Sequence, residues 1–274
     1  MVHRFSSHDA MKPGLLKAAM AVLVLAGLGS CTQQGVPVAP GIDPAPRTGP
    51  LERRTQEPLP ARKADVAYIF VGGFAEPVLL QFREIYEQLP LLPCEGMQLR
   101  AYYAWESGTG NLFFHSTWKL QRDLRAFLAL NPAADVVLVG HSYGGSAIMD
   151  ALRGVADVPH TGKVLVVTVD PVSRRERSKP RERAPQVDFW INSYCYPYRN
   201  VRDVAARIGG PWRECPQADV NLRFSALARD DDGKRYAHVY PRSLLMEQPI
   251  GQEKSAYQHL LDACQKLGIG KLIE

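Results

Sequence analysis

The segment 140–144, Gly-His-Ser-Tyr-Gly, limits the possible folds of this chain more than any other. It directly follows the apolar run 136–139, and apolar residues recur at helical spacing after it. So tight a turn between a strand and a helix brings the chain close to its neighbours, so glycine is suited to both sides of the turn. Such a turn holds Ser142 at its tip. A bare G-x-S-x-G can also be an ordinary glycine turn, but this flanking pattern favours a reactive serine.

Short apolar segments alternate with helical patterns along the rest of the chain. Continuous apolar runs are typical of strands that are covered on both faces of a parallel sheet. The alternation predicts an α/β domain with a doubly wound, mostly parallel, six-stranded sheet. The expected strands are 65–71, 97–105, 136–139, 163–169, 187–195 and 220–228, and the expected helices lie near 79–89, 120–128, 148–155 and 260–267.

The N-terminal part of the chain predicts export. Basic residues precede a charge-free apolar run at 18–29, and small residues stand just before Cys31. This form predicts a secretory signal peptide over residues 1–30, and its run is shorter than the roughly 20 apolar residues of a membrane span. Residues 31–64 are rich in proline and poor in large apolar residues, which predicts a disordered tether. Residues 65–274 then form one α/β domain.

Charge and cysteine content narrow the expected partners. The formal net charge of +5 is mild, and basic residues do not interleave with aromatic ones, so nucleic acid is not an expected partner. Cys94, Cys195, Cys215 and Cys264 lie in the expected domain, where an even number permits two disulfides in an exported protein. Cys195 and Cys215 flank one short segment and are the favoured pair. Their spacing fits no zinc pattern, so no metal is expected.

The order of these features resembles the α/β-hydrolase fold over about residues 65–270, without a large cap domain. The resemblance implies that Ser142 is the nucleophile and that an acid and then a histidine follow it in the chain. Asp170 ends the next strand in an Asp-Pro pair, similar to pancreatic-type lipases, and is the preferred acid. Asp203 is the alternative, and the Asp-Pro pair can also be a purely structural turn.

Chain order also selects the base. Only His238 and His259 follow Asp170, and His238 comes after the last expected strand and a polar loop, where the family carries its base. His259 falls inside the expected C-terminal helix. The resemblance implies two backbone donors for an oxyanion, the amides of Tyr143 and Phe74, although the Gly-Gly pair before Phe74 can also be a plain tight turn. No cofactor is expected.

The end of the apolar N-terminal run resembles a bacterial lipoprotein signal. This resemblance implies that Cys31 is lipidated and becomes the mature N-terminus. Thr32 after it, in place of an aspartate, implies sorting to the outer membrane, facing the periplasm, in a Gram-negative host. A plain signal peptide that is cleaved nearby and an uncleaved anchor are the alternatives.

Together these motifs predict a lipid-anchored serine hydrolase. It would cleave a carboxylic ester or thioester of a small molecule or a lipid through an acyl-serine intermediate. The membrane, reached through the anchor, is the other expected partner, and the oligomeric state is left open. An acyltransferase would use the same residues. A catalytically silent hydrolase fold that serves as an envelope binding or assembly protein is the alternative from a different class.

Overall fold

The structure is a computed structural model of the chain. All the residues that it describes lie in one folded unit, Arg54–Glu274. The described residues are 56–73, 81–104, 118–173, 182–198 and 203–270.

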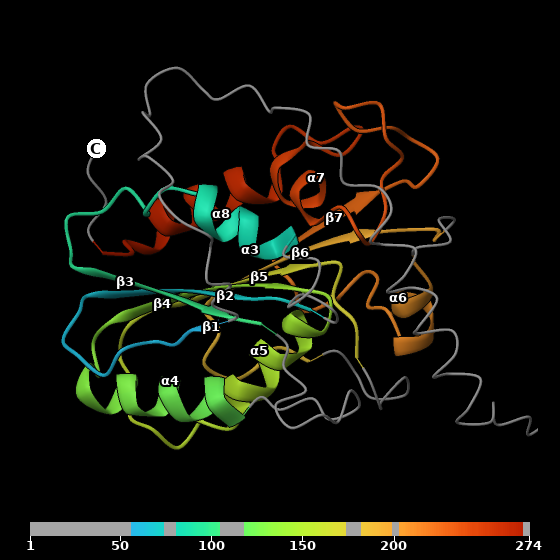
Figure 1. Cartoon of the computed structure of the whole chain (residues 1–274). Helices are drawn as coiled ribbons and strands as arrows, with labels where there is room; N and C mark the ends of the chain where they lie inside the picture. The colour runs from blue at the N-terminus through green and yellow to red at the C-terminus, as the bar shows by residue number, and fades with distance from the viewer. Residues whose placement is uncertain (1–55, 74–80, 105–117, 174–181, 199–202, 271–274) are drawn as a thin grey trace, which may run out of the picture. The chain divides into compact units, whose positions relative to one another are not determined.

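A seven-stranded sheet forms the centre of this unit, in the order β1-β3-β2-β4-β5-β6-β7 (Figure 1). Six strands run parallel, and only β1 runs antiparallel, beside β3. The carboxyl ends of the parallel strands therefore meet along one edge of the sheet, where α/β folds bind ligands. The strands are β1 Gln56–Glu57, β2 Val66–Val71, β3 Gln98–Tyr103, β4 Asp135–His141, β5 Val164–Val169, β6 Phe189–Cys195 and β7 Val220–Phe224.

Helices cover both faces of the sheet, as Figure 1 shows. Successive side chains of a buried strand point to opposite faces, so each face has its own apolar core. Phe70 of β2 packs in the core under α3, α7 and α8, whereas its neighbour Ile69 packs in the core under α4 and α5. The helices are α3 Gln81–Gln88, α4 Trp118–Leu130, α5 Tyr143–Arg153, α6 Val204–Gly209, α7 Pro241–Met246 and α8 Ala256–Leu267.

The predicted doubly wound parallel sheet is confirmed, with one strand more than expected. β1 consists of Gln56 and Glu57 and adds an antiparallel edge to the six parallel strands. It lies within the segment that the sequence assigned to the tether. Leu59 is also buried there, and its amide donates to the hydroxyl of Tyr103 at 2.9 Å. Residues 56–64 are therefore part of the folded unit, because they supply an edge and an apolar contact that their proline-rich composition does not reveal.

The predicted disulfide between Cys195 and Cys215 is wrong in this structure. All four cysteines of the described part carry reduced thiols. Cys195 ends β6 in the core under α8, whereas Cys215 is buried in the core on the opposite face of the sheet. Short separation along the chain made the pair look suitable, but the sheet lies between the two side chains.

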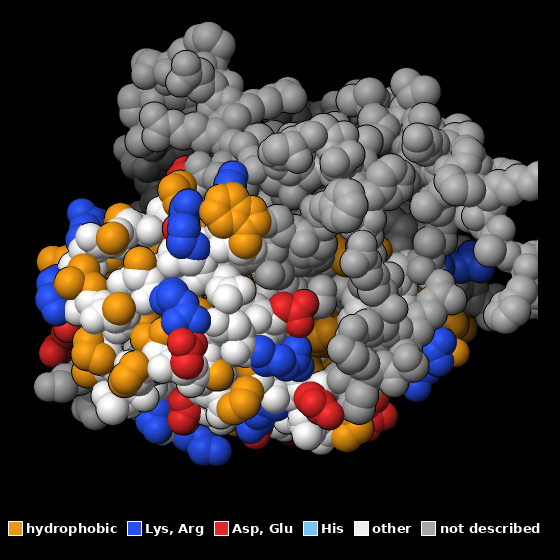
Figure 2. All heavy atoms as spheres, turned by 90° about the horizontal axis from the view of Figure 1, so that it is seen from below, with side chains coloured by type: hydrophobic (Ala, Val, Ile, Leu, Met, Phe, Trp, Pro, Cys, Tyr) orange, Lys and Arg blue, Asp and Glu red, His pale blue; other side chains and the backbone are white. Residues whose placement is uncertain are grey.

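On the side of α4, the described surface carries charged and apolar side chains mixed together (Figure 2). Seen from the side of α4, Lys and Arg side chains lie interspersed with Asp, Glu and apolar side chains (Figure 2). Within the described ranges, no helix combines the length and the apolarity that crossing a bilayer requires.

Candidate active site

Ser142 lies at the sharp turn between β4 and α5, with φ 57° and ψ −126°. This left-handed backbone is uncommon for a residue with a side chain and marks a strained turn. A Cβ on Gly73 would overlap the Cβ of Ser142, and a Cβ on Gly144 would overlap the backbone oxygen of Val71. These two glycines are therefore required by the close approach of β2 to the turn.

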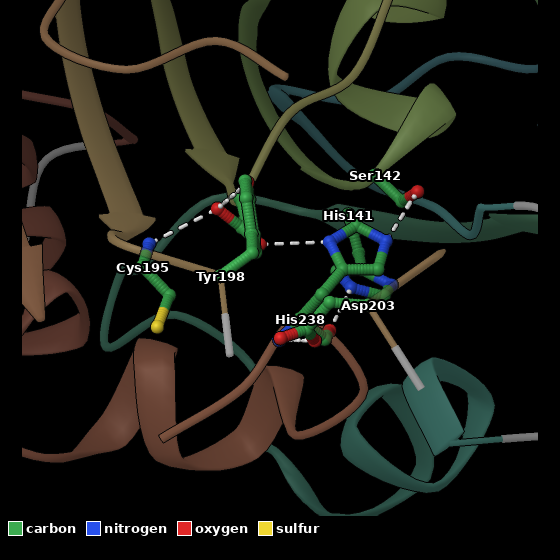
Figure 3. A network of polar contacts seen from close by, with 7 residues as sticks. His141, Ser142, Cys195, Tyr198, Asp203 and His238 are labelled. Atoms are coloured by element: carbon green, nitrogen blue, oxygen red, sulfur yellow. Dashed lines mark hydrogen bonds and ion pairs between the residues drawn. The ribbon is translucent and has the colours of Figure 1, made fainter. Parts of the chain in front are cut away.

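His238 lies beside Ser142, as Figure 3 shows, and its ring bridges Ser142 and Asp170. Its Nε2 is 2.9 Å from the Ser142 hydroxyl oxygen, and its Nδ1 is 2.7 Å from Asp170 Oδ2. The serine is 3% exposed, the histidine 5% and the aspartate 0%. Asp170 directly follows β5, and His238 lies in the loop between β7 and α7. The structure thus brings together the three side chains that the sequence favoured, and His259 lies apart from them on α8.

The other oxygen of Asp170 is also held. Asp170 Oδ1 accepts the backbone N–H of Cys195 at 3.0 Å and the hydroxyl of Tyr198 at 2.8 Å. Burial, followed by the nearby Asp170 carboxylate, raises the pKa of Tyr198 far above its usual value, so the phenol stays a proton donor. This carboxylate is therefore fixed by donors on β6 and in the loop after it while its second oxygen faces the imidazole.

Asp203, the alternative acid, has a different place. Its Oδ1 accepts the backbone N–H of His238 at 2.9 Å, and the residue is fully buried just before α6. Asp203 thus holds the main chain of the histidine, and Asp170 holds its ring. Two carboxylates therefore contact one residue in distinct ways, and Figure 3 shows Asp203 beside His238.

His141, the residue before the serine, contacts the same loop from the other side. Its Nε2 lies 2.9 Å from the backbone oxygen of His238, and the centroids of the two rings are 4.9 Å apart. Burial, followed by the neighbouring His238, lowers the pKa of His141 to about 3. The ring is therefore neutral at pH 7, and it must carry its proton on Nε2 to donate to that carbonyl.

Sequence reasoning missed the contacts of His141 and Tyr198. His141 carried a signal, since it is a polar residue inside the serine motif, at the end of an apolar strand. Tyr198 carried none, because its hydroxyl reaches Asp170 only through the pairing of β5 with β6. Of the two expected oxyanion donors, Tyr143 begins α5, where helix N–H groups favour negative charge, and Phe74 lies outside the described residues.

The arrangement is suited to transferring a proton from a serine. A buried carboxylate orients the imidazole, whose free nitrogen accepts the hydroxyl proton as the oxygen attacks an electrophile. Among the described residues, no group of three or more His, Cys, Asp or Glu side chains is placed to hold a metal ion.

A family model described as an alpha/beta hydrolase family matches residues 92–266, which is more than half of the chain. The matched range includes Ser142, Asp170 and His238, and it extends from ahead of β3 into α8. No curated protein matches the chain.

Proposed function

Because the chain belongs to the alpha/beta hydrolase family, we propose that it is a serine hydrolase that cleaves a carboxylic ester or thioester through an acyl-serine intermediate. Family membership supports a hydrolase-type function broadly. The observation that carries the finer proposal is the continuous hydrogen-bonded chain from the Ser142 hydroxyl through His238 to Asp170. Each atom in this chain has the role that acyl transfer to serine demands.

In the first half of the reaction, Ser142 Oγ attacks the carbonyl carbon while His238 Nε2 takes the hydroxyl proton. Asp170 stabilises the imidazolium that forms and keeps its ring oriented. The tetrahedral oxyanion lies near the amino end of α5, where the amide of Tyr143 is the expected donor. The imidazolium then gives its proton to the departing alcohol or thiol, which leaves the acyl group on the serine oxygen.

In the second half, a water molecule repeats the attack on the acyl-serine. His238 takes a proton from the water, a second tetrahedral intermediate forms, and Ser142 leaves with that proton. The carboxylic acid is released and the serine hydroxyl is restored. If an alcohol took the place of water, the same residues would perform acyl transfer, and the ratio of acid to new ester in the products distinguishes the two reactions.

Active-site labelling tests the proposal. A fluorophosphonate probe, which reacts with an activated serine, should label the wild-type protein and fail to label Ser142→Ala. Ser146→Ala is a matched control, because the Ser146 hydroxyl only donates to the backbone oxygen of Tyr143 within α5, and this variant should be labelled. A well-folded wild-type protein that resists the probe and hydrolyses no 4-nitrophenyl ester would be a catalytically silent member of the family.

The cellular location is a separate proposal. We propose that residues 1–30 are a lipoprotein signal peptide and that lipidated Cys31 anchors the protein at the cell envelope, on the periplasmic face of the outer membrane. The basic, apolar and small-residue segments before this cysteine support it. Cys31→Ser should abolish palmitate labelling and move the protein out of the membrane fraction. Cys94→Ser, which changes a cysteine of the folded domain, should alter neither, and membrane retention of Cys31→Ser would refute the anchor.

A further inference from the structure

A cavity of about 620 Å³ lies at the carboxyl end of β6. Its volume is typical of small-molecule sites, which span roughly 300–1,000 Å³. It also lies at the edge of the sheet where parallel α/β folds bind ligands. The cavity is lined by Tyr196 and Tyr198 from the loop after β6, by Arg207 of α6, and by Arg213 with the Gly210–Pro211 turn.

This cavity adjoins the candidate active site. Tyr198 lines the cavity, and its hydroxyl donates to Asp170 at 2.8 Å. Pro211, another lining residue, forms a β-bridge with Val172, whose N–H donates to the backbone oxygen of Ser142 at 3.0 Å. Val172 thus links the lining residue Pro211 to the main chain of the reactive serine, and the cavity lies beside the candidate active site.

The cavity wall is anchored to the core of the fold. Ser173 donates its N–H to the backbone oxygen of Gly210 at 3.0 Å. The buried side chain of Asn192 on β6 donates to the backbone oxygen of Arg213 at 2.7 Å. These bonds hold the main chain at Gly210 and at Arg213, on both sides of the turn that lines the cavity.

Among the described residues, the charge that lines the cavity is positive and is not neutralised. None of the described residues that line it is acidic. In the described part of the structure, neither Arg207 nor Arg213 has an ion pair, whereas Arg125 is paired with Asp157 and Arg183 with Asp219. The Arg213 guanidinium lies over the Tyr196 ring, 4.1 Å from its centroid, which leaves its N–H groups available at the edge.

A second cavity, of about 640 Å³, differs from the first in the charged residues that line it. It lies at the opposite edge of the sheet, beside the amino ends of β2 and β4. Two of its three carboxylates accept backbone hydrogen bonds: Asp65 accepts the N–H of Met97 at 2.8 Å, and Asp135 accepts the N–H of Gly270 at 2.8 Å. The arginine-lined cavity differs from it in having no acidic residue among its described lining residues, so it suits an anion.

We infer that the cavity between Tyr196, Arg207 and Arg213 binds an oxyanion, a carboxylate or a phosphate, carried by the substrate of Ser142. The guanidinium group presents paired N–H donors that match the oxygens of both anions. This inference rests on the proposed hydrolase function, because it takes Ser142 to be the residue that attacks the substrate. It defines the substrate class as an ester or thioester with an acidic group near the bond that is cleaved.

The first test measures binding without chemistry. Ser142→Ala protein is titrated with succinate and with inorganic phosphate by calorimetry, and the tighter of the two identifies the anion. Replacing both Arg207 and Arg213 with Gln in this background should weaken binding at least about tenfold, as expected for the loss of charge-assisted hydrogen bonds. Arg62→Gln, which removes an exposed arginine far along the chain from the cavity, should not. Unchanged affinity in the double variant, or no binding of either anion, overturns the inference.

The second test measures preference. The mono-4-nitrophenyl ester of succinate, which has a free carboxylate, is compared with methyl 4-nitrophenyl succinate. In this second ester a methyl ester replaces the carboxylate, so the acyl chain is the same but carries no charge. The ratio of kcat/KM for the charged over the neutral ester should exceed about ten in the wild type and approach one in the Arg207→Gln, Arg213→Gln double variant. A ratio that the double variant leaves unchanged refutes the cavity's role. If neither ester is hydrolysed, the proposed function fails, and the binding test still decides whether the cavity takes anions.

Discussion

Besides the His238 ring, two other groups contact Asp170: the N–H of Cys195 and the hydroxyl of Tyr198. We expect the second of these to contribute measurably to activity. Tyr198→Phe removes the 2.8 Å hydrogen bond to Asp170 Oδ1 and leaves the Cys195 N–H in place. One hydrogen bond contributes about 0.5–1.5 kcal/mol, so kcat/KM for a neutral ester should fall about two- to thirteenfold. Tyr257→Phe, a half-buried tyrosine on α8, controls for the loss of a phenol. An unchanged kcat/KM in Tyr198→Phe would show that the carboxylate is held without it.

His141 predicts how stability depends on pH. Its folded pKa is about 3, below the ordinary value of 6.5, so the unfolded chain binds this proton more readily than the folded protein. The contribution of His141 to the free energy of unfolding is therefore complete above pH 6.5. This contribution falls as the pH drops toward 3, by at most about 1.4 kcal/mol per pH unit. His141→Gln removes the titrating group and should flatten this slope in urea unfolding at successive pH values. Parallel curves for the two proteins would contradict the buried neutral ring.

At the scale of elements, the β4–α5 turn depends on the end of β2. A Cβ on Gly73 would overlap Ser142, so Gly73→Ala must displace the serine or the strand end. We expect a loss of about 100-fold in esterase kcat, since a displacement of about 1 Å at a reacting atom has this effect, and about 1–3 kcal/mol of stability. Activity and urea unfolding are measured on the same protein.

Gly251→Ala is the control for Gly73→Ala, because it adds backbone strain without displacing Ser142. Gly251 has φ 80°, and nothing lies within 4 Å of the point that a Cβ would occupy there. Alanine at this position therefore costs about 1 kcal/mol of stability through backbone strain alone. Its activity should equal that of the wild type. If Gly73→Ala behaved the same way, the close approach of β2 to Ser142 would not matter for catalysis.

Elements with a strong local pattern were predictable from the sequence. β2, β4 and β5 contain long apolar runs, and chain order then limits which carboxylate and histidine can reach Ser142. β1 was not predictable, because two polar residues, Gln56 and Glu57, carry no strand pattern. The position of Asp203 on the backbone of His238 was likewise hidden, since it depends on how two loops meet at the sheet edge.

At the scale of the whole molecule, the sheet divides the interior into two cores, and this division decides the chemistry of the cysteines. Cys195 and Cys264 lie in the core under α8, and Cys215 lies in the core of the other face. Burial raises the pKa of Cys264 to about 12 and also raises the pKa of Cys195. Thiols with raised pKa values react slowly at neutral pH, because the thiolate is the reactive form.

These positions predict a protein without disulfides in its folded domain. In a Cys31→Ser chain purified without reductant, Cys94, Cys195, Cys215 and Cys264 should all react with a thiol reagent after unfolding in urea. In the native protein, the three buried thiols should react only as fast as the fold opens. The melting temperature should not change when dithiothreitol is added, because no cross-link restricts the unfolded chain. A shortfall of one pair of thiols that dithiothreitol restores, together with a drop in melting temperature, would mean that export oxidises this domain into an arrangement other than the one described.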